Sequence, residues 1–383
     1  MKITFYSNFF THHQEPFCLE MVKKYGDDFK FVSTIRIPEE RLNLGYKNID
    51  DKYDFIIRAY ENQVEYNRAL KLAIDSDIVI MGSTSDEYIE ERLKQDKITF
   101  RYCERIFFDG IRTWLKQDKR NMIIQKHLKY RKNKNLYMLC ASAYGTNDFS
   151  KIGAYKGKTF KWGYFPETIK YNIDELILKK SQNSPIIIVW VGRFIPCKHP
   201  EYMIKLAQNL KQEGYTFKIK MLGTGKLFGA IQEAVKQYNL EENIELLGGT
   251  PSEKVRKYME EANIFAFTSD KKEGWGAVLN EAMNSGTAII ANKYIGAVPF
   301  LIDDRRNGLI YTTFNEFYNR TKELIENEKL RETLSKNAYK TIEKEWNSKN
   351  ATENLIRLFE GVLKNKIPNI EKGPASKAVK VKE

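Results

Sequence analysis

Cysteine is scarce in the sequence, and long apolar runs are missing from it. Four cysteines occur in 383 residues, with no CxxC pair among Cys18, Cys103, Cys140 and Cys197. This spacing suggests neither a disulfide framework nor a structural zinc site, and it predicts a reducing, cytoplasmic setting. No apolar stretch approaches the roughly 18 residues that a transmembrane helix needs, and the amino terminus lacks the apolar core of a signal peptide. We therefore expect a protein that neither spans a membrane nor is exported by that route.

Low-complexity composition is also missing, which excludes disorder for the chain as a whole. Hydrophobic residues make up 42% of the chain and aromatic residues 13%. This is enough apolar surface to form substantial cores. At about 100 to 200 residues per domain, the length predicts two domains, or three at most.

Acidic residues are outnumbered by basic ones. Lys and Arg total 63 against 50 Asp and Glu, which gives a formal net charge of +13. An excess of this size predicts an anionic partner, which can be nucleic acid, anionic lipid or a phosphorylated small molecule. Composition alone leaves these three open.

Short β-rich runs alternate with amphipathic stretches along most of the chain. This alternation is typical of parallel sheets covered by helices on both faces, and it predicts two doubly wound α/β units in series. In the first half we expect strands at Ile3–Ser7, Lys30–Ile37, Phe55–Arg58, Ile78–Gly82, Thr99–Cys103 and Leu136–Cys140. In the second half we expect them at Ile186–Val191, Phe217–Leu222, Ile244–Leu247, Ile264–Thr268, Thr287–Ala291 and Gly308–Tyr311. The polar stretch Lys170–Pro185 is interpreted as a linker between the units.

The last part of the chain is predicted to be helical and then disordered. Apolar residues recur at helical spacing in Phe314–Asn327, Leu330–Glu345 and Asn350–Lys364. From Lys364 to Glu383, six Lys and two Glu give a net charge of +4, and Pro and Gly interrupt any regular pattern. We therefore expect an N-terminal domain over residues 1–170, a second over 171–345, a final helix over 346–365 and a basic disordered tail over 366–383.

Cationic and glycine-rich loops follow two predicted strands of the second half. Arg193 and Lys198 come directly after Ile186–Val191, at the carboxyl end where open α/β sheets bind ligands. Gly223 and Gly225 follow the next strand, where backbone N–H groups can approach a phosphate. A GxG alone is a weak signal, and the two glycines are equally consistent with a tight turn.

Two carboxylates lie further along the same half. Glu273 precedes a glycine-rich turn, and Glu281 lies about two turns inside the helix predicted through Met283. Eight residues of regular helix span about 12 Å, which suits the two ends of one elongated ligand better than an acid/base pair on one atom. A fourth segment, Ile295–Pro299, follows the next strand and is predicted to close the same rim.

These segments together resemble one family. The ordered set VGRFIPCK (191–198), MLGTG (221–225), SDKKEGWGAVLNEAMNSG (269–286) and NGLIY (307–311) looks like the C-terminal domain of the retaining nucleotide-sugar glycosyltransferases of family four, which have the GT-B fold. The resemblance implies two Rossmann-like domains facing a central cleft, with a last helix that returns to the N-terminal domain. In the first half, SNFFTHHQ (7–14) and KWGYFPE (161–167) look like segments of bacterial surface-polysaccharide glycosyltransferases.

The resemblance also implies roles for particular residues. Arg193 and Lys198 would hold the diphosphate of a nucleoside-diphosphate sugar, Glu273 would bind hydroxyls of the transferred sugar, and Glu281 would bind the ribose. Backbone amides of the turn before the helix would join them, from Gly274, Trp275, Gly276, Ala277 and Val278. We expect a retaining transfer to a glycan or lipid-linked acceptor, with no metal ion as cofactor, because fixed cations can neutralise the departing diphosphate. Asp75-Ser76-Asp77 matches the Asp-x-Asp motif of metal-dependent glycosyltransferases, but it precedes a strand, and we do not expect it to bind a metal.

Several residues keep two interpretations. The indole of Trp275 either packs in the core or lines the sugar pocket. His12 and His13 follow the first strand and can face a ligand, and we take His13 as a candidate catalytic residue. Glu104 and Arg105 lie at a similar edge and are as readily structural. His127 and His199 are predicted to be surface residues.

A basic cluster in the first half has its own alternatives. Lys116–Lys134 contains eight Lys or Arg and one Asp, and it follows several apolar residues. It can dock on an anionic membrane surface at the inner face of the cell membrane, or it can be the solvated face of a core-packed stripe. A protein that binds nucleic acid through this cluster is the competing function, although no nucleic-acid module is recognisable. A non-catalytic sugar-binding partner subunit with the same fold is a third.

Overall fold

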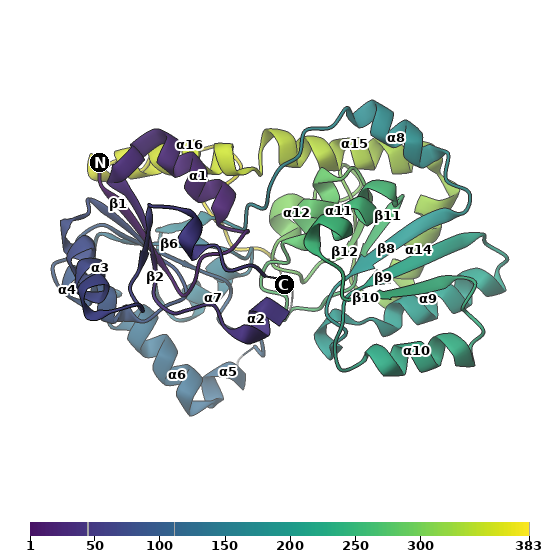
Figure 1. The fold of residues 1–383 in the computed structure, drawn as a ribbon, viewed down its shortest axis with the longest axis horizontal. Coiled ribbons are helices and arrows are strands. Elements are labelled where there is room, and N and C mark those ends of the chain that lie inside the picture. Colours follow the sequence, from purple (N-terminus) through teal and green to yellow (C-terminus); the bar gives the residue numbers. More distant parts are fainter. Residues whose placement is uncertain (44–45, 111, 383) are drawn as a thin grey trace. The chain divides into compact units, whose positions relative to one another are not determined.

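The computed structural model describes residues 1–43, 46–110 and 112–382. The chain forms two compact units, the first made of Met1–Glu167 with Trp346–Glu383 and the second of Thr168–Glu345. Each unit is built around one parallel sheet with helices on its faces (Figure 1). The prediction of two Rossmann-like units is therefore confirmed. No helix in the described ranges is both long and apolar enough to cross a membrane.

The first unit contains a seven-stranded sheet in the order β3-β2-β1-β4-β5-β6-β7, in which every neighbouring pair is parallel. The six strands expected in this half are all present, and three of them have the predicted bounds. The seventh, β7, was not predicted. The strands are β1 Ile3–Ser7, β2 Phe29–Ser33, β3 Ile56–Arg58, β4 Ile78–Met81, β5 Thr99–Cys103, β6 Leu136–Cys140 and β7 Thr159–Lys161.

The helices of the first unit include the last helix of the chain, α16 (Ser348–Leu363), which packs against α1 (Glu15–Tyr25). The apolar side predicted for α16 is buried, and the ring of Phe359 lies 4.9 Å from the ring of Phe100 in β5. The return of the last helix to the first unit is therefore confirmed. The other helices of this unit are α2 Glu39–Asn43, α3 Gln63–Asp75, α4 Glu90–Lys94, α5 Arg112–Leu115, α6 Gln117–Ile123 and α7 Gly145–Lys151.

The second unit contains a six-stranded parallel sheet in the order β10-β9-β8-β11-β12-β13. Its strands are β8 Ile186–Val191, β9 Phe217–Leu222, β10 Ile244–Gly248, β11 Ile264–Phe267, β12 Ala288–Asn292 and β13 Leu309–Tyr311. Its helices are α8 Ile173–Ser181, α9 Glu201–Gln212, α10 Phe228–Gln237, α11 Ser252–Glu261, α12 Val278–Asn284, α13 Val298–Leu301, α14 Phe314–Glu326 and α15 Glu328–Lys344.

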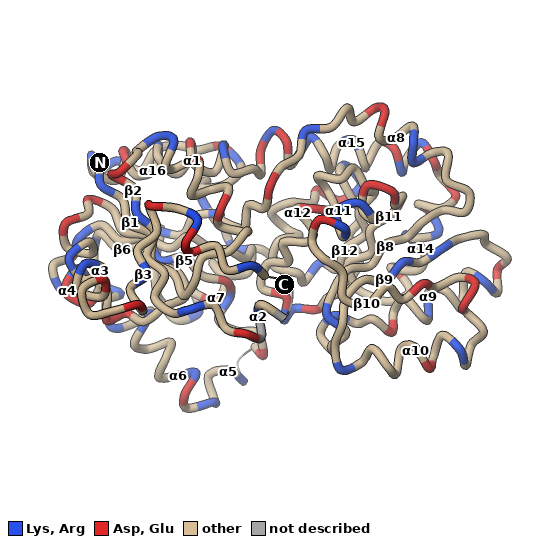
Figure 2. Tube along the Cα trace, in the orientation of Figure 1, with Lys and Arg blue, Asp and Glu red and all other residues tan. Residues whose placement is uncertain are grey.

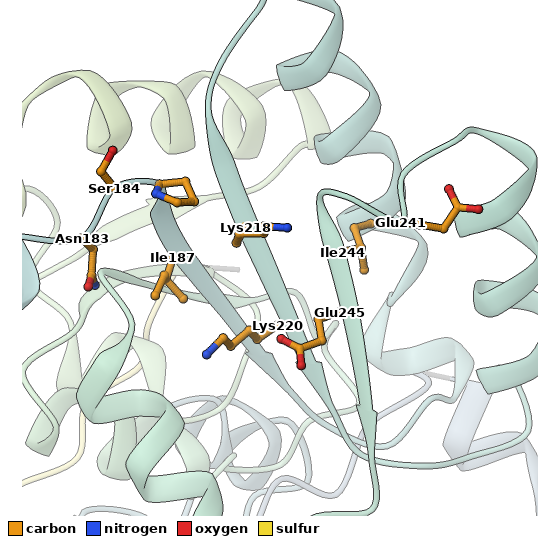
Figure 3. A pocket seen from close by; sticks show the side chains of 9 residues that line it. Asn183, Ser184, Ile187, Lys218, Lys220, Glu241, Ile244 and Glu245 are labelled. Carbon is orange, nitrogen blue, oxygen red and sulfur yellow. The ribbon is translucent and has the colours of Figure 1, made fainter.

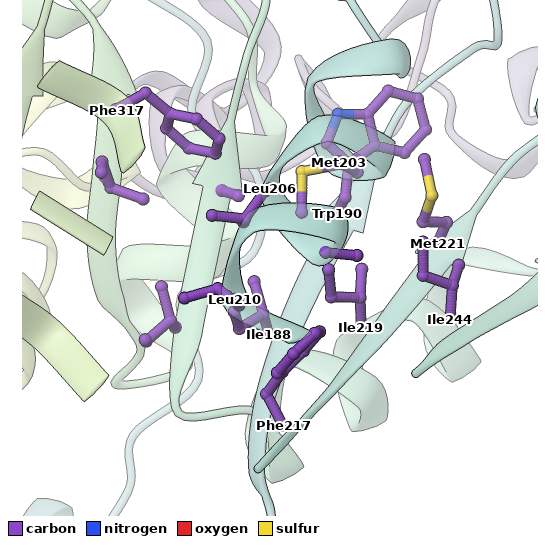
Figure 4. Close-up of a cluster of buried hydrophobic side chains, with 14 of the residues drawn as sticks. Ile188, Trp190, Met203, Leu206, Leu210, Phe217, Ile219, Met221, Ile244 and Phe317 are labelled. Atoms are coloured by element: carbon purple, nitrogen blue, oxygen red, sulfur yellow. The ribbon is translucent and has the colours of Figure 1, made fainter. Parts of the chain in front are cut away.

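Periodicity explains the core of the second unit. Ile188 and Trp190 alternate along β8 and point to one face of the sheet, where Met203, Leu206 and Leu210 of α9 cover them (Figure 4). The spacing of three, four and seven residues in α9 places its apolar side chains in one stripe. The apolar side chains of the strand and of the helix therefore pack together in one buried cluster beneath the carboxyl edge of the sheet.

The stretch predicted as a linker is instead a helix of the second unit. Residues 173–181 form α8, in which Ile177 and Lys180 are buried. The Lys180 ammonium donates to the carbonyl oxygens of Met259 (3.0 Å), Ser285 (2.7 Å) and Gly286 (2.9 Å). Burial holds the pKa of Lys180 well below its usual range. The polar composition suggested a linker, but Lys180 is buried because its ammonium caps the carboxyl ends of both α11 and α12.

The carboxyl-terminal segment expected to be disordered instead pairs with the edge strand β7. Phe160 and Lys377 form an antiparallel bridge, Lys161 N donates to Ser376 O (2.8 Å), and Ala378 N donates to Thr159 O (3.1 Å). Ala375 and Ala378 are buried against this edge. An edge strand has unpaired backbone groups, and a passing segment can satisfy them whatever its side-chain composition. Composition therefore predicted disorder for residues that backbone pairing orders.

Deleting residues 367–383 is expected to lower the melting temperature by roughly 5–10 °C, because it removes several backbone hydrogen bonds at about 1 kcal/mol each together with buried alanines. Differential scanning calorimetry measures this change. The control, Lys380→Gln with Lys382→Gln, removes charge but keeps the backbone, and it should melt like the wild type. An unchanged melting temperature after the deletion would contradict the pairing.

Candidate active site

Four loops of the second unit meet at one edge of its sheet. Strands β9, β8, β11 and β12 are consecutive neighbours in the parallel sheet, so the segments that follow them lie at the same carboxyl edge. These are the four segments singled out from the sequence. In open α/β sheets this edge is where ligands bind.

The glycines after β9 are required by the loop that carries Arg193. Gly223 has φ 130°, and a Cβ there would lie 2.0 Å from the Gly192 carbonyl oxygen. At Gly225 (φ 150°) a Cβ would lie 2.6 Å from Phe194 O. Phe194 N donates to Thr224 O at 2.8 Å, so the two loops are joined through their backbones. The two glycines therefore position the Arg193 loop, and their contact with a phosphate stays a prediction.

Lys198 and Glu273 form an ion pair at this edge, between Nζ and Oε2. Ser269 Oγ donates to the same carboxylate oxygen at 3.0 Å. Each side chain of the pair is 15% exposed, so both can be reached by a ligand while their position is fixed. Arg193 lies on the same loop as Lys198, and its side chain is exposed. The structure thus brings together three of the four predicted catalytic residues.

A histidine missed from the sequence connects two of these loops. His199 Nδ1 lies 2.7 Å from Glu201 Oε1, and His199 Nε2 lies 3.5 Å from Asp270 Oδ2. The Asp270 carboxylate, followed by that of Glu201, raises the pKa of His199 to about 9. Asp270 N also donates to Cys197 O at 2.9 Å. His199 is therefore a cation that joins the Lys198 loop to the Glu273 loop, and not the plain surface residue that we expected.

Replacing His199 by asparagine is expected to remove a stabilisation that is present only at lower pH. Asparagine suits the left-handed backbone at this position (φ 49°). Because the folded-state pKa of about 9 lies above the unfolded value, the protonated imidazole stabilises the fold fully below about pH 6.5 and loses this effect as the pH rises through about 9. The difference in melting temperature between wild type and variant should shrink from a few degrees to near zero across this range. A difference that does not change with pH would contradict the ion pair.

The segment around Glu273 turns more sharply than predicted. The helix α12 begins only at Val278, so Glu281 lies in its first turn and not two turns inside. Gly276 has φ 91°, and a Cβ there would lie 2.5 Å from Cζ of Phe267. Gly296 N donates to Glu273 O at 3.1 Å, which joins the fourth segment to the third. The glycine-rich turn is thus fixed by the strand beneath it and by the loop beside it.

The surroundings of Trp275 favour a packing role, whereas Glu281 keeps its predicted role as a ligand-binding carboxylate. The Trp275 indole is fully buried and donates to Asn280 Oδ1 at 3.0 Å, so of its two interpretations the structure favours packing. Burial raises the pKa of Glu281, and the nearby Arg256 guanidinium opposes this effect. Arg256 also donates to Asn284 Oδ1 at 2.8 Å. Carboxyl groups with a pKa raised by burial occur at functional sites and also in structural networks.

In the first unit, two histidines lie after β1. The rings of His12 and His13 lie 4.0 Å apart, and the ring of Tyr164, from the segment after β7, lies 5.9 Å from that of His13. Burial lowers the pKa of His13 to about 3, so its imidazole is neutral near pH 7. Within the described residues, His13 Nδ1 is buried and has no hydrogen-bond partner. This orphan nitrogen is the feature that keeps His13 a candidate.

Arg105 and His127 have structural roles in the first unit, and Glu104 lies near the histidine pair. Arg105 pairs with the buried Asp148 at 3.2 Å. His127, expected at the surface, is buried, and its Nδ1 lies 2.9 Å from the Tyr155 hydroxyl. Glu104 Oε1 accepts from the Tyr164 hydroxyl at 2.9 Å, which places it beside the histidine pair. Only Glu104 of these three thus lies next to a candidate ligand-binding group.

The Asp-x-Asp sequence lies at the amino end of β4. Asp77 Oδ2 accepts from the backbone N–H of Lys2 at 2.8 Å. Over residues 1–43, 46–110 and 112–382, no group of three or more His, Cys, Asp or Glu side chains is arranged to hold a metal ion.

One open depression of the second unit lies at the opposite edge of the sheet. It has a volume of about 420 Å³ and is lined at the starts of β8, β9 and β10 (Figure 3). Lys218, Lys220, Glu241 and Glu245 give it a mixed charge. None of the predicted site residues lines this depression, so we do not assign it to the donor.

Comparisons with known proteins agree with the geometry of the second unit. Residues 174–341 match the family model of glycosyl transferases group 1. A glycosyltransferase of Methanocaldococcus jannaschii, described as uncharacterized, is 32% identical over 151 residues, which are 39% of this chain and 41% of the relative. The amylovoran biosynthesis glycosyltransferase AmsK of Erwinia amylovora is 29% identical over 153 residues, or 39% and 36% of the two chains. The matched part thus spans less than half the length of these relatives.

Solved structures extend the likeness to both units. HepE of Anabaena, in complex with UDP, has a TM-score of 0.67 at 15% identity and covers 94% of this chain and all of its own. Sucrose-phosphate synthase of Thermosynechococcus elongatus has a TM-score of 0.66 at 14% identity, with 96% and 100% covered. This likeness shows the fold, which is the GT-B arrangement of two Rossmann-like sheets. Residues 174–341 therefore form a domain of the glycosyl transferases group 1 type, and this match covers less than half of the chain.

Proposed function

We propose that this protein transfers a sugar, with retention of configuration, from a nucleoside-diphosphate sugar to a glycan or lipid-linked acceptor in the synthesis of cell-surface polysaccharide. The second unit holds the donor, the first unit receives the acceptor, and no metal ion takes part. The observation that carries the proposal is the Lys198–Glu273 ion pair beside Arg193, at the carboxyl edge of a sheet in a domain of this family.

The chemistry follows from the charge of the leaving group. The bond from the sugar anomeric carbon to the diphosphate oxygen breaks, and a bond from that carbon to an acceptor oxygen forms. The acceptor proton moves to an oxygen of the departing diphosphate. Arg193 and Lys198 neutralise the charge that develops on the diphosphate, which lowers the barrier because these cations are already in place.

The ion pair gives the ligand-free site a defined resting state. The charges of Lys198 and Glu273 neutralise each other, so neither partly buried charge is uncompensated in the absence of a donor. When a donor enters, the ammonium turns to the diphosphate and the carboxylate becomes free to accept from sugar hydroxyls. Glu281, which is partly exposed, accepts from the ribose hydroxyls. The donor thus replaces the Lys198–Glu273 ion pair, because its diphosphate binds Lys198 and its sugar hydroxyls bind Glu273.

The relatives support the donor class and the kind of product. HepE was solved with UDP and also with UDP-glucose. AmsK is a glycosyltransferase of amylovoran biosynthesis, and WcaL of Escherichia coli, 28% identical over 134 residues (34% of this chain, 33% of the relative), is a putative one of colanic acid biosynthesis. On the basis of these relatives, uridine diphosphate is the first nucleotide to test, and exopolysaccharide precursors are the first class of acceptor to test.

His13 is proposed to contact the transferred sugar or the acceptor. Its neutral imidazole has an orphan Nδ1, which can donate to or accept from a sugar hydroxyl. A neutral ring suits hydroxyl recognition because it brings no charge to the reaction centre.

A thermal-shift panel of nucleoside diphosphates and their sugars tests the donor assignment, because a ligand that binds the native state raises the melting temperature. We expect one base to be preferred and the shift to persist in the presence of a chelator. Slow donor hydrolysis without an acceptor would distinguish an enzyme from a sugar-binding partner subunit. If no nucleotide stabilises the protein, or if a chelator abolishes turnover reversibly, the proposal fails.

A further inference from the structure

The first unit carries a basic segment that the proposed chemistry does not use. We define the basic hairpin as residues 112–134, which comprise α5, α6, the π-helical turn Ile124–Leu128 and the residues before β6. Helices α5 and α6 lie at one end of the unit, away from its sheet (Figure 1). The hairpin is thus an appendage to the fold, with one side packed and one side open.

The inner side of the hairpin is anchored in the core. Ile123 is fully buried, and His127 is buried and bonded to Tyr155. Phe107, which precedes the hairpin, is also buried, and its ring lies 6.4 Å from that of Trp114. Leu128 and Tyr130 also pack against the core, so the core-facing stripe of the hairpin is formed by these side chains.

Three large apolar side chains remain on the outside. Leu115 is 75% exposed, Ile124 41% and Met122 40%. The packed stripe that we weighed as the alternative interpretation of this cluster therefore does not account for them. Exposed apolar side chains gathered in one appendage are typical of an interaction surface.

Lys and Arg residues occur along the same segment of the chain (Figure 2). Some are already engaged, since Lys116 pairs with Asp109, Lys129 pairs with Glu90, and Lys126 donates to Thr84 O. Lys119, Arg131 and Lys132 are exposed, and none of the three forms an ion pair with an acidic side chain in the described parts of the chain. From Lys116 to Lys134 the net charge is +7. The hairpin therefore combines unpaired positive charge with exposed aliphatic surface.

We propose that the basic hairpin docks this protein on an anionic bilayer, with Leu115, Met122 and Ile124 entering the interface and the cations contacting lipid phosphates. The inference rests on the proposed function in one respect, because docking would bring the enzyme to a lipid-linked acceptor. A bilayer fits better than nucleic acid, since aliphatic side chains gain free energy on leaving water for the acyl boundary but find no such medium along a phosphate backbone.

Vesicle sedimentation tests the docking without reference to turnover. The wild type should bind phosphatidylcholine vesicles with about 30 mol% phosphatidylglycerol and should stay in solution with pure phosphatidylcholine, because the cytoplasmic-type surface charge attracts Lys and Arg. Lys119→Gln with Lys132→Gln should lower the partition coefficient at least tenfold, at about fivefold for each charge. Leu115→Gln should lower it about tenfold, as expected for one leucine withdrawn from the interface.

Matched variants separate the hairpin from net charge. Lys236→Gln with Lys329→Gln removes the same two charges from exposed positions on α10 and α15, and it should sediment like the wild type. All variants should keep the wild-type melting temperature and the wild-type response to nucleoside diphosphates. That response tests the proposed function independently, so the two proposals can fail separately.

Three outcomes would overturn the docking. The first is equal binding of the wild type to anionic and neutral vesicles, or to neither. The second is an equal loss in the hairpin variants and in the matched variant, which would make the effect one of net charge. The third is binding of a single-stranded oligonucleotide that depends on Lys119 and Lys132 without any vesicle binding, which would assign the surface to nucleic acid.

Discussion

Replacing Lys198 by alanine is expected to lower donor turnover by about 10³-fold, at the upper end of the range for one preorganised charge-stabilising group. The structure explains why this loss should be large. Lys198 is paired with Glu273, so the substitution removes one positive charge and also leaves a half-buried carboxylate uncompensated where the diphosphate must lie. An unpaired carboxylate repels the developing negative charge, which adds to the loss of attraction.

A double variant distinguishes this explanation from simple loss of a cation. Glu273→Gln alone should lower kcat/KM by about 10²-fold, because the amide binds sugar hydroxyls less strongly than the carboxylate. In the double variant with Lys198→Ala the repulsive charge is absent, so the total loss should stay near 10³-fold instead of reaching the additive 10⁵-fold. The measurement is kcat/KM for the donor identified by thermal shift, with melting temperatures as the control for folding. Additive losses would contradict the pairing, and near wild-type turnover of Lys198→Ala would contradict the site.

Strand positions could be predicted from the sequence where a buried apolar run ends abruptly. The runs at β6 and β8 have their predicted bounds because both faces of a parallel strand are covered, and the apolar stretch is as long as the strand. The strand β7 was not predicted, and the segment at Lys377 that forms a bridge with it lies more than two hundred residues away. Pairing over such a distance leaves no local pattern.

The polar stretch before β8 shows a second limit. The α8 helix has the charged residues of a solvated segment, but Lys180 serves the carbonyl groups at the ends of two other helices. A side chain that is buried because it satisfies distant backbone acceptors cannot be recognised from its neighbours in the chain.

The positions of the site loops could be predicted from the sequence, but the ion pairs between their side chains could not. The order of the motifs places Arg193, Lys198 and Glu273 at one edge because neighbouring parallel strands present their carboxyl ends together. The ion pair of Lys198 with Glu273 and the bridge from His199 to Asp270 join residues about seventy positions apart. The local sequence indicated only one carboxylate near His199, that of Glu201 two residues later, and it did not indicate the contact with Asp270.

Arg193 provides the second large prediction, and it differs from Lys198 in a way the structure defines. Arg193→Ala should lower donor turnover by about 10²-fold, less than Lys198→Ala, because its exposed side chain leaves no buried carboxylate behind. The loss should fall mainly on kcat, since the guanidinium acts on charge that grows as the diphosphate leaves. Kinetics with the donor identified by thermal shift would measure this.

The conservative replacement sharpens the test. Arg193→Lys should recover part of the activity, because the charge is kept while the two-pronged contact with phosphate oxygens is lost. Lys236→Ala, an exposed cation on α10 outside this edge, should turn over donor like the wild type. Gly223 and Gly225 hold the Arg193 loop through backbone contacts, so a side chain at Gly223 should reproduce the loss without changing any charge. If Arg193→Ala were active while Gly223→Ala was not, the loop and not the cation would be what the donor requires.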